Sequence, residues 1–428
     1  MTTLQITGGK VLLPDLSVED ADVLVDQDAG TILDVGDVEA GDETLDASGS
    51  LVMPGLVNAH CHAAMTLLRG YADDKPLMDW LQEDIWPAEA QLTPEDVRVG
   101  TELGIVEMLK AGVTTFADMY FEVPEVSAAV EDLGVRARIG HGIVTIGKDE
   151  DDAWDDIEES IEVASEFDGA AGGRIKTAVM PHSLTTVGEE YYREFLPEVR
   201  EAGLPVHYHA NETLGEVEPI VEEHGERPIE YAADLGMLDA GDFFAHGVHL
   251  DETEISVLAA HDASVVHCPA SNMKLASGMA PVQALRDAGV TVALGTDGAA
   301  SNNDLDLFDE MRDAAMLGKL ATGDASAVPA EAVVEMATQG GADALGFDVG
   351  RIEAGAKADL AVVDFEAPHL TPAHDYVSHL AYAVRGSDVR HTVCDGQVLM
   401  RDRDVLVCDE AAVRERAAEH AAALVDRA

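Results

Sequence analysis

The chain has 428 residues, of which 83 are acidic and 26 basic, so its formal net charge is −57 at pH 7. Such an acidic surface excludes nucleic acid and anionic membranes as partners, because both bind through basic patches. Self-repulsion of this size needs high salt, where the Debye length falls to about 3 Å at 1 M. We therefore expect a halophilic protein, and a cytoplasmic one, since no basic segment followed by an apolar stretch opens the chain.

The first 50 residues contain short apolar runs separated by Gly and Asp, a pattern typical of β-strands. These runs are 4–7, 11–13, 21–25 and 31–35. Similar runs return at 360–363 and 389–400, and the Ala, Leu and Val spacing over 410–425 predicts an amphipathic helix. We expect the two ends of the chain, 1–50 and 350–428, to pack together as one small composite β-sandwich domain.

The middle of the chain alternates apolar, strand-like runs with helix-compatible stretches, which favours a parallel α/β architecture. We place eight strands at 51–58, 113–118, 136–144, 174–180, 204–209, 242–246, 264–267 and 291–296. Eight such units predict a (β/α)8, TIM-like barrel over residues 51–349. In that fold the catalytic groups lie at the C-terminal ends of the strands.

The first of these strands ends in His60-Cys61-His62. Alternate residues of an extended strand point to the same side, so His60 and His62 can aim two imidazoles at one point. The strand at 204–209 ends in a third imidazole, that of His209. Three neutral imidazoles with one carboxylate and space for water would suit a zinc or iron ion.

Carboxylates and one further histidine follow the later strands. Glu212 lies three residues after His209, His246 ends the strand at 242–246, and Asp297 follows the strand at 291–296. A metal in this position would lower the pKa of bound water to about 7. Glu212, His246 and Asp297 are chemically suited to carry the protons that hydrolysis would then release.

Motifs containing these residues lie along most of the chain. They are His60-x-His62, His209-x-x-Glu212-Thr213, Ala245-His246-Gly-Val-His-Leu250, Leu294-Gly-Thr-Asp-Gly-Ala-Ala-Ser-Asn-Asn303 and Pro269-Ala-Ser-Asn-Met-Lys274. Taken together, they resemble the amidohydrolase superfamily and, within it, the 5'-methylthioadenosine/S-adenosylhomocysteine deaminases. The resemblance implies an aminohydrolase that converts an adenine nucleoside to the hypoxanthine nucleoside and ammonia.

The resemblance also assigns a cofactor and catalytic roles. It implies one divalent metal, with zinc expected first and iron, manganese or cobalt as alternatives, held by His60, His62, His209 and Asp297. Glu212 would protonate the purine ring nitrogen beside the attacked carbon, and Asp297 would take the proton of the water. His246 would polarise the hydroxide or steady the tetrahedral oxygen.

Substrate contacts are implied at four positions: Glu89, His182, Glu212 and Asp297. Glu89 matches a position that contacts ribose hydroxyls. The loop after the third strand, 141–154, is acidic and Lys148 is its only cation. A carboxylate ligand would prefer a guanidinium, so this loop leaves acceptance of S-adenosylhomocysteine open, while 5'-methylthioadenosine, 5'-deoxyadenosine and adenosine, all neutral, fit it at least as well. The directions of Arg136 and Arg138 stay open.

Two alternatives remain within the superfamily. A deaminase of free bases such as guanine, or a triazine-type chlorohydrolase, would not use Glu89 for ribose. A two-metal cyclic amidohydrolase would need a carboxylated lysine, for which Lys176 is the candidate, although it lies several residues before its strand ends. We further expect His207 to make a hydrogen bond inside the barrel, whereas a role for His267 in bracing the site is the less favoured interpretation of that residue. A small-molecule nucleoside is the expected partner, with a homo-oligomer as the assembly.

Overall fold

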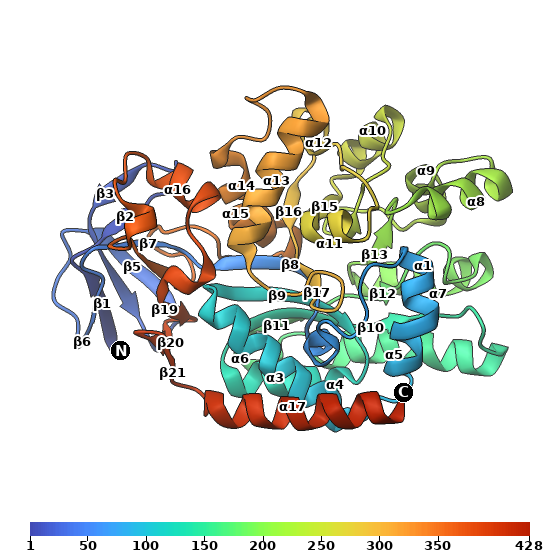
Figure 1. Ribbon diagram of the computed structural model, residues 1–428, viewed down its shortest axis with the longest axis horizontal. Coiled ribbons are helices and arrows are strands. Elements are labelled where there is room, and N and C mark those ends of the chain that lie inside the picture. The colour runs from blue at the N-terminus through green and yellow to red at the C-terminus, as the bar shows by residue number, and fades with distance from the viewer.

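The computed structural model describes all 428 residues. Two sheets formed by the ends of the chain lie together on one side of the molecule (Figure 1). One has the order β5-β4-β1-β6, with β1 Thr3–Thr7, β4 Asp22–Asp26, β5 Thr31–Gly36 and β6 Glu43–Asp46. The other has the order β21-β20-β19-β18-β7-β2-β3, with β2 Lys10–Leu12, β3 Val18–Asp20, β7 Ser50–Pro54, β18 Leu360–Asp364, β19 Val389–Cys394, β20 Gln397–Arg401 and β21 Asp404–Val405. A separate apolar core that includes Leu4, Val25 and Val362 joins them.

Parallel strands occupy the centre of the molecule. One sheet contains β8 Leu56–His62, β9 Val113–Tyr120, β10 Arg136–Ile143, β11 Ile175–Thr177, β12 Met180–Pro181 and β17 Asp297–Gly298. The second contains β13 His207–Ala210, β14 Phe243–His246, β15 Ser264–His267 and β16 Val292–Leu294. Isolated bridges from Val179 to Val206 and from Ser183 to His209 link the two sheets. Since β17 follows β16 and pairs with β8, the pairing returns to its starting strand.

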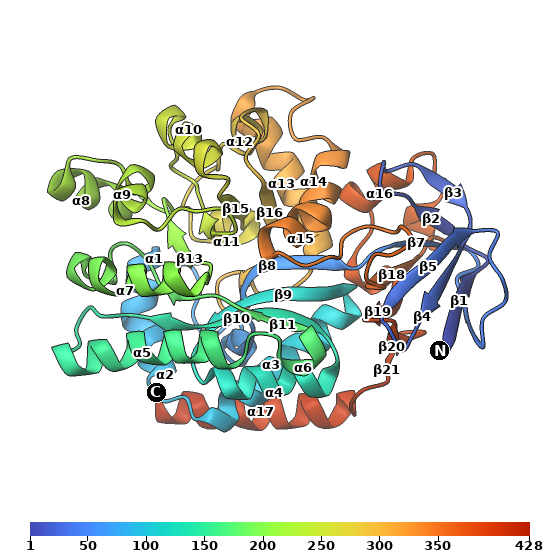
Figure 2. The same cartoon turned by 180° about the vertical axis from the view of Figure 1, so that it is seen from behind.

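Helices cover the outside of these strands (Figures 1 and 2). The longer ones are α3 Pro94–Lys110, α4 Val123–Leu133, α5 Glu150–Glu166, α7 Glu189–Ala202, α8 Leu214–His224, α9 Pro228–Leu235, α10 Glu252–His261, α13 Leu307–Thr322, α14 Ala330–Ala337 and α17 Glu410–Arg427. The shorter ones are η1 Ala63–Leu68, α1 Leu77–Trp80, η2 Leu81–Ile85, α2 Trp86–Glu89, α6 Ala170–Gly173, α11 Pro269–Lys274, α12 Val282–Asp287, α15 Gln339–Leu345, η3 Pro368–Leu370, α16 Tyr376–Tyr382 and η4 Gly386–Asp388. None of the helices is both long enough and apolar enough to cross a membrane.

The predicted strand at 51–58 is wrong as a single element, because the structure divides it into β7 and β8. Strand β7 pairs with β2 and β18 in the outer sheet, whereas β8 pairs with β9. Gly55 separates them, and a Cβ there would collide with the side chain of Thr114. The chain thus changes sheets where only glycine fits. The predicted strand at 174–180 is also divided, into β11 and β12.

Candidate active site

The proposed metal ligands meet where β8 and β13 end and where the short β17, which follows β16, begins. His60 and His62 come from β8, His209 from β13 and Asp297 from β17, and all four side chains are buried. One nitrogen or oxygen atom of each lies within 4.8 Å of those of the others. The distances from Asp297 Oδ1 are 3.5 Å to His60 Nε2 and 3.2 Å to His62 Nε2.

Backbone carbonyls set the orientation of two of these rings. His62 Nδ1 lies 2.6 Å from the carbonyl oxygen of Met119, and His209 Nδ1 lies 2.7 Å from that of His182. A carbonyl can only accept, so both Nδ1 atoms must carry the hydrogen. The lone pair of each Nε2 is then directed at the cluster. Ligating histidines are usually oriented in this way.

A second histidine sets the orientation of His60. His207 Nδ1 lies 3.0 Å from the carbonyl oxygen of Phe243, so it donates and leaves Nε2 as an acceptor. That acceptor lies 2.9 Å from His60 Nδ1, which donates to it. His60 Nε2 is consequently a buried lone pair, and it has no hydrogen-bond partner. An unpaired buried acceptor among two further imidazoles and a carboxylate fits one divalent metal. His207 makes the interior hydrogen bond that was predicted.

Hydroxyl groups fix the carboxylate of Asp297. Its Oδ2 accepts from Ser271 Oγ at 2.6 Å and from Ser301 Oγ at 2.8 Å, and its Oδ1 accepts from the N–H of Gly298 at 2.8 Å. Asp297 has a left-handed backbone, with φ of 62°. A non-glycine residue held in this strained conformation needs surrounding contacts to maintain it.

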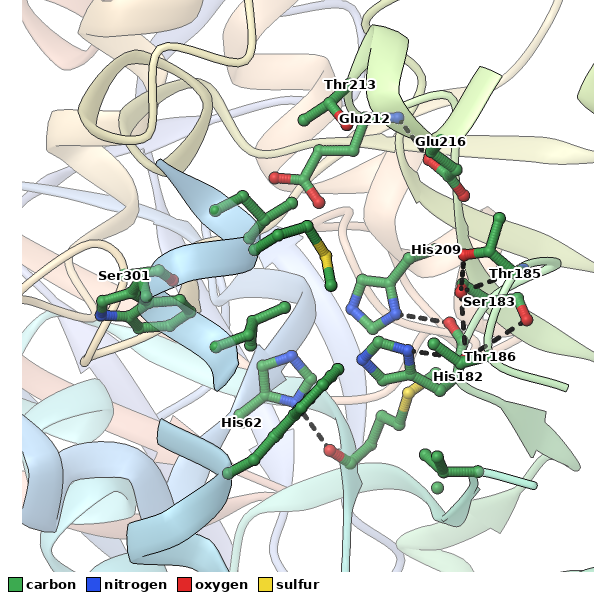
Figure 3. Close-up of a pocket in the computed structure, with 18 of the residues that line it drawn as sticks. His62, His182, Ser183, Thr185, Thr186, His209, Glu212, Thr213, Glu216 and Ser301 are labelled. Atoms are coloured by element: carbon green, nitrogen blue, oxygen red, sulfur yellow. Dashed lines mark hydrogen bonds between the residues drawn. The ribbon is translucent and has the colours of Figure 1, made fainter. Parts of the chain in front are cut away.

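A cavity of about 390 Å³ opens beside this cluster. It is lined by residues that include Glu89, His182, Glu212, His246 and Asp297. In Figure 3 the rings of His62, His182 and His209 lie together, and the carboxyl group of Glu212 stands on one side of them. The structure therefore brings the predicted substrate and proton-transfer residues to the predicted metal cluster.

Glu212 and His246 face each other across this cavity. Glu212 Oε2 lies 3.7 Å from His246 Nε2, and Glu212 Oε1 accepts from Ser277 Oγ at 3.2 Å. His246 Nδ1 lies 2.9 Å from Asn272 Oδ1, which directs Nε2 into the cavity. Burial raises the pKa of Glu212, and nearby His246 opposes the shift. A raised pKa keeps the proton on a carboxyl group to higher pH, which suits Glu212 to act as a general acid.

Glu89 and His182 line the same cavity, where burial disfavours the charged form of each. Burial raises the pKa of Glu89 to about 7, although the adjacent Tyr120 hydroxyl favours the carboxylate. Glu89 Oε1 is buried without a partner. Burial, together with the nearby His62 and His60, lowers the pKa of His182 to about 4, so its ring is neutral at pH 7.

Cationic side chains do not line this cavity. Lys148 pairs with Asp156 at 2.9 Å. Arg136 pairs with Asp359 and Asp395, and Arg138 donates to the carbonyls of Leu345 and Thr177. Their directions, open from the sequence, are therefore away from the site.

Two other lysine and histidine hypotheses have different outcomes. The ammonium group of Lys176 donates to the carbonyl oxygen of Gly346, and Lys176 does not line the cavity. The alternative in which Lys176 bridges two metals is therefore wrong. His267 is buried with Nδ1 unpaired and makes no hydrogen bond to a proposed ligand. Its bracing role stays a prediction.

Sequence reasoning missed several supporting residues. Ser271 and Asn272 lie in the motif at 269–274, and Ser301 lies in the motif at 294–303. The motifs therefore marked these residues, but they did not show that the residues bond to Asp297 and His246. Glu216, whose side chain accepts from the N–H of Glu212 at 2.9 Å, had only the spacing of a helix cap.

Comparisons with known proteins agree with this geometry. Residues 51–399 match the model of the amidohydrolase family. The chain belongs to this family. It is 72% identical over 426 residues to a 5-methylthioadenosine/S-adenosylhomocysteine deaminase of Halobacterium salinarum, covering 100% of this chain and 99% of the relative. It is 47% identical over 401 residues to a 5'-deoxyadenosine deaminase of Methanosarcina acetivorans, covering 93% of each.

A solved structure is also similar to this amidohydrolase over its length. It is an adenosine deaminase from Xanthomonas campestris with bound zinc, 37% identical, with a TM-score of 0.94 and coverage of 99% of both chains. The predicted family is confirmed, as is a hydrolase that acts on carbon–nitrogen bonds. The amidohydrolase fold, with one divalent metal at the His and Asp cluster, is supported in the same way.

Proposed function

We propose that this amidohydrolase deaminates an adenine nucleoside, giving the hypoxanthine nucleoside and ammonia. The observation that carries the proposal is the buried cluster of His60, His62, His209 and Asp297, which shares one cavity with the carboxyl group of Glu212. The names of the three similar proteins described above, each a deaminase of an adenine nucleoside, support it.

We infer that the metal is zinc, held by His60, His62, His209 and Asp297, as three imidazoles and one carboxylate suit zinc. When bound, such a metal lowers the pKa of water to about 7 and so supplies a hydroxide nucleophile at neutral pH. The proposal also includes a (β/α)8 barrel that begins at β8, within the predicted residues 51–349, and a β-sandwich of residues 1–50 and 350–428 to which β7 adds a strand. The returning strand pairing supports the barrel.

Three side chains of the enzyme then handle protons. Asp297 accepts the proton of the attacking water at a carboxylate oxygen, while Ser271 and Ser301 hold that carboxylate in place. Glu212 donates a proton to the ring nitrogen beside the attacked carbon. His246 donates its Nδ1 hydrogen to Asn272 Oδ1, and in its doubly protonated form its Nε2 donates a hydrogen bond to the oxygen that develops on that carbon. Asp297 then passes the proton that it accepted to the amino group, and Glu212 takes a proton from the hydroxyl group on the attacked carbon. The carbon–nitrogen bond breaks, ammonia leaves and the keto product remains.

Glu89 and His182 bind the rest of the nucleoside. The unpaired oxygen of Glu89 can accept a hydrogen bond from a ribose hydroxyl. Neutral His182, whose Nδ1 lies 3.1 Å from Thr186 Oγ1, offers its other nitrogen to the nucleoside. A free base would leave Glu89 without a partner, so the nucleoside is the better fit.

The substituent at the 5' position is neutral in this proposal. Apolar side chains such as Leu77, Trp80 and Ile146 line the cavity, and its lining residues include no lysine or arginine. The carboxylate of S-adenosylhomocysteine would be desolvated there without a counter-ion, which is costly. 5'-Methylthioadenosine, 5'-deoxyadenosine and adenosine avoid that cost.

The test is ammonia release in molar KCl by protein of measured metal content. We expect turnover of the three neutral nucleosides, with kcat/KM for S-adenosylhomocysteine lower by about 100-fold or more, since a desolvated unpaired charge costs several kcal/mol. Guanine serves as the free-base control and should not react. Metal-loaded protein that is silent on all the adenine nucleosides would refute the proposed function. The homo-oligomeric assembly stays a prediction.

A further inference from the structure

The turn that carries Glu212 is held from behind by two buried carboxyl groups. Asn211 has a left-handed backbone, with φ of 55°, and its Nδ2 donates to Glu254 Oε1 at 2.9 Å. The next N–H, that of Glu212, donates to Glu216 Oε2 at 2.9 Å. The Glu212 side chain itself accepts only from Ser277, at the longer distance of 3.2 Å. Its position therefore depends largely on its backbone.

Glu216 does not make the helix cap that its spacing predicts. Thr213 and Glu216 have the spacing of a capping box, in which the glutamate accepts from the N–H of the threonine. In α10 the corresponding pair, Asp251 and Glu254, makes both bonds of the box. In α8 the Thr213 side chain makes no capping bond, and Glu216 reaches one residue further, to Glu212.

The second oxygen of Glu216 is also unusual. Oε1 is buried and has no hydrogen-bond partner, although the residue lines the cavity. Figure 3 shows the Glu216 side chain on the cavity wall next to Glu212. Burial raises the pKa of Glu216 to about 8, so at pH 7 it is mostly uncharged and does not repel the carboxyl group of Glu212.

We propose that Glu216 is a positioning residue, whose Oε2 holds the backbone of Glu212 so that the Glu212 carboxyl group stands at the ring nitrogen it protonates. This inference rests on the proposed function. A glutamine at position 216 would keep the acceptor, because its amide oxygen can replace Oε2 at the same place. An apolar side chain would remove it.

The experiment compares Glu216→Gln and Glu216→Met with the wild-type enzyme on 5'-methylthioadenosine. For Glu216→Met we expect kcat to fall by roughly 10- to 100-fold with KM changed by less than about threefold, since small misplacements of a catalytic group have effects of this size. Glu216→Gln should retain kcat to within about threefold. Glu218→Met, an exposed change in the same helix, is the matched control. Metal content and thermal unfolding establish that each variant is folded, and Glu216→Ala replaces Glu216→Met if the latter is not.

A double-mutant cycle shows whether Glu216 acts through Glu212. In the Glu212→Gln background, Glu216→Met should change kcat by less than about threefold, because the group that it positions is already lost. Folded Glu216→Met with wild-type kcat, Glu216→Gln as impaired as Glu216→Met, or additive effects in the cycle would each overturn the inference. A metal-loaded wild-type enzyme without activity on adenine nucleosides would refute the proposed function itself. The outcomes above, in contrast, would overturn only the role of Glu216 in an active enzyme.

Discussion

The two ends of the parallel strands differ in how their buried ionisable side chains are paired. At the C-terminal ends His60 Nε2, Glu89 Oε1 and Asp118 Oδ2 are buried without partners. Near the start of β10, by contrast, the guanidinium of Arg136 makes bonds of 2.9 and 3.1 Å to Asp359 and one of 2.6 Å to Asp395. Unpaired buried groups cost stability and are retained where a ligand will pair with them. The comparison thus contrasts ionisable groups left unpaired around the candidate site with an ion-pair network that maintains the fold.

We expect the largest effect on stability from breaking the ion pairs of Arg136, near the start of β10. Arg136→Met leaves Asp359, whose side chain is 0% exposed, without its cation. Removing one partner of a buried ion pair costs about 3–5 kcal/mol, so we expect a loss of this size in the free energy of unfolding. The folded enzyme should keep its kcat, because Arg136 lies away from the cavity. Denaturant unfolding in molar KCl measures the loss.

Arg193→Met is the control for this change. Arg193 pairs with Glu189 at 2.6 Å, but its side chain is 49% exposed, so its loss should cost less than about 1 kcal/mol. If Arg136→Met and Arg193→Met lost equal free energies of unfolding, the buried ion pairs of Arg136 would not have the stabilising role assigned to them.

The second effect concerns the orientation of a metal ligand. His207→Phe retains a ring that can stack on Phe243, 4.1 Å away between centroids, but removes the acceptor of the His60 N–H. Loss of such a partner lowers metal affinity by roughly 10- to 100-fold, which competition with a chelator measures. The matched control is His224→Phe, because His224 also stacks on an aromatic ring, that of Tyr231, yet lies outside the cavity. Unchanged affinity in His207→Phe would contradict the role of His207.

The elements that could be predicted from the sequence are those with a local signal. Strand ends bearing His60, His62 and Asp297 are visible because apolar runs stop there. The division at Gly55 was missed, because both halves of the run are buried and apolar and the pairing partners lie far away in the chain. The role of Glu216 was missed for a similar reason, since its spacing is that of an ordinary helix cap.

The smallest effect that we expect is a gain in stability on replacing Glu89, whose buried Oε1 has no hydrogen-bond partner. The folded-state pKa of Glu89 is raised from 4.5 to about 7, so the folded state favours the neutral form, and stability is lost as pH rises from about 4.5 to about 7. Glu89→Gln has no charge to bury, so at pH 8 it should unfold with a free energy higher than wild type by at least about 1 kcal/mol, and at pH 4 with the same free energy. Its KM for 5'-methylthioadenosine should rise, because the amide keeps only one of the two acceptor oxygens that the carboxylate offers to the ribose hydroxyls. Glu95→Gln, an exposed change, is the control for the pH dependence. If Glu89→Gln were no more stable than wild type at pH 8, the unpaired carboxyl group would not be a cost of the binding site.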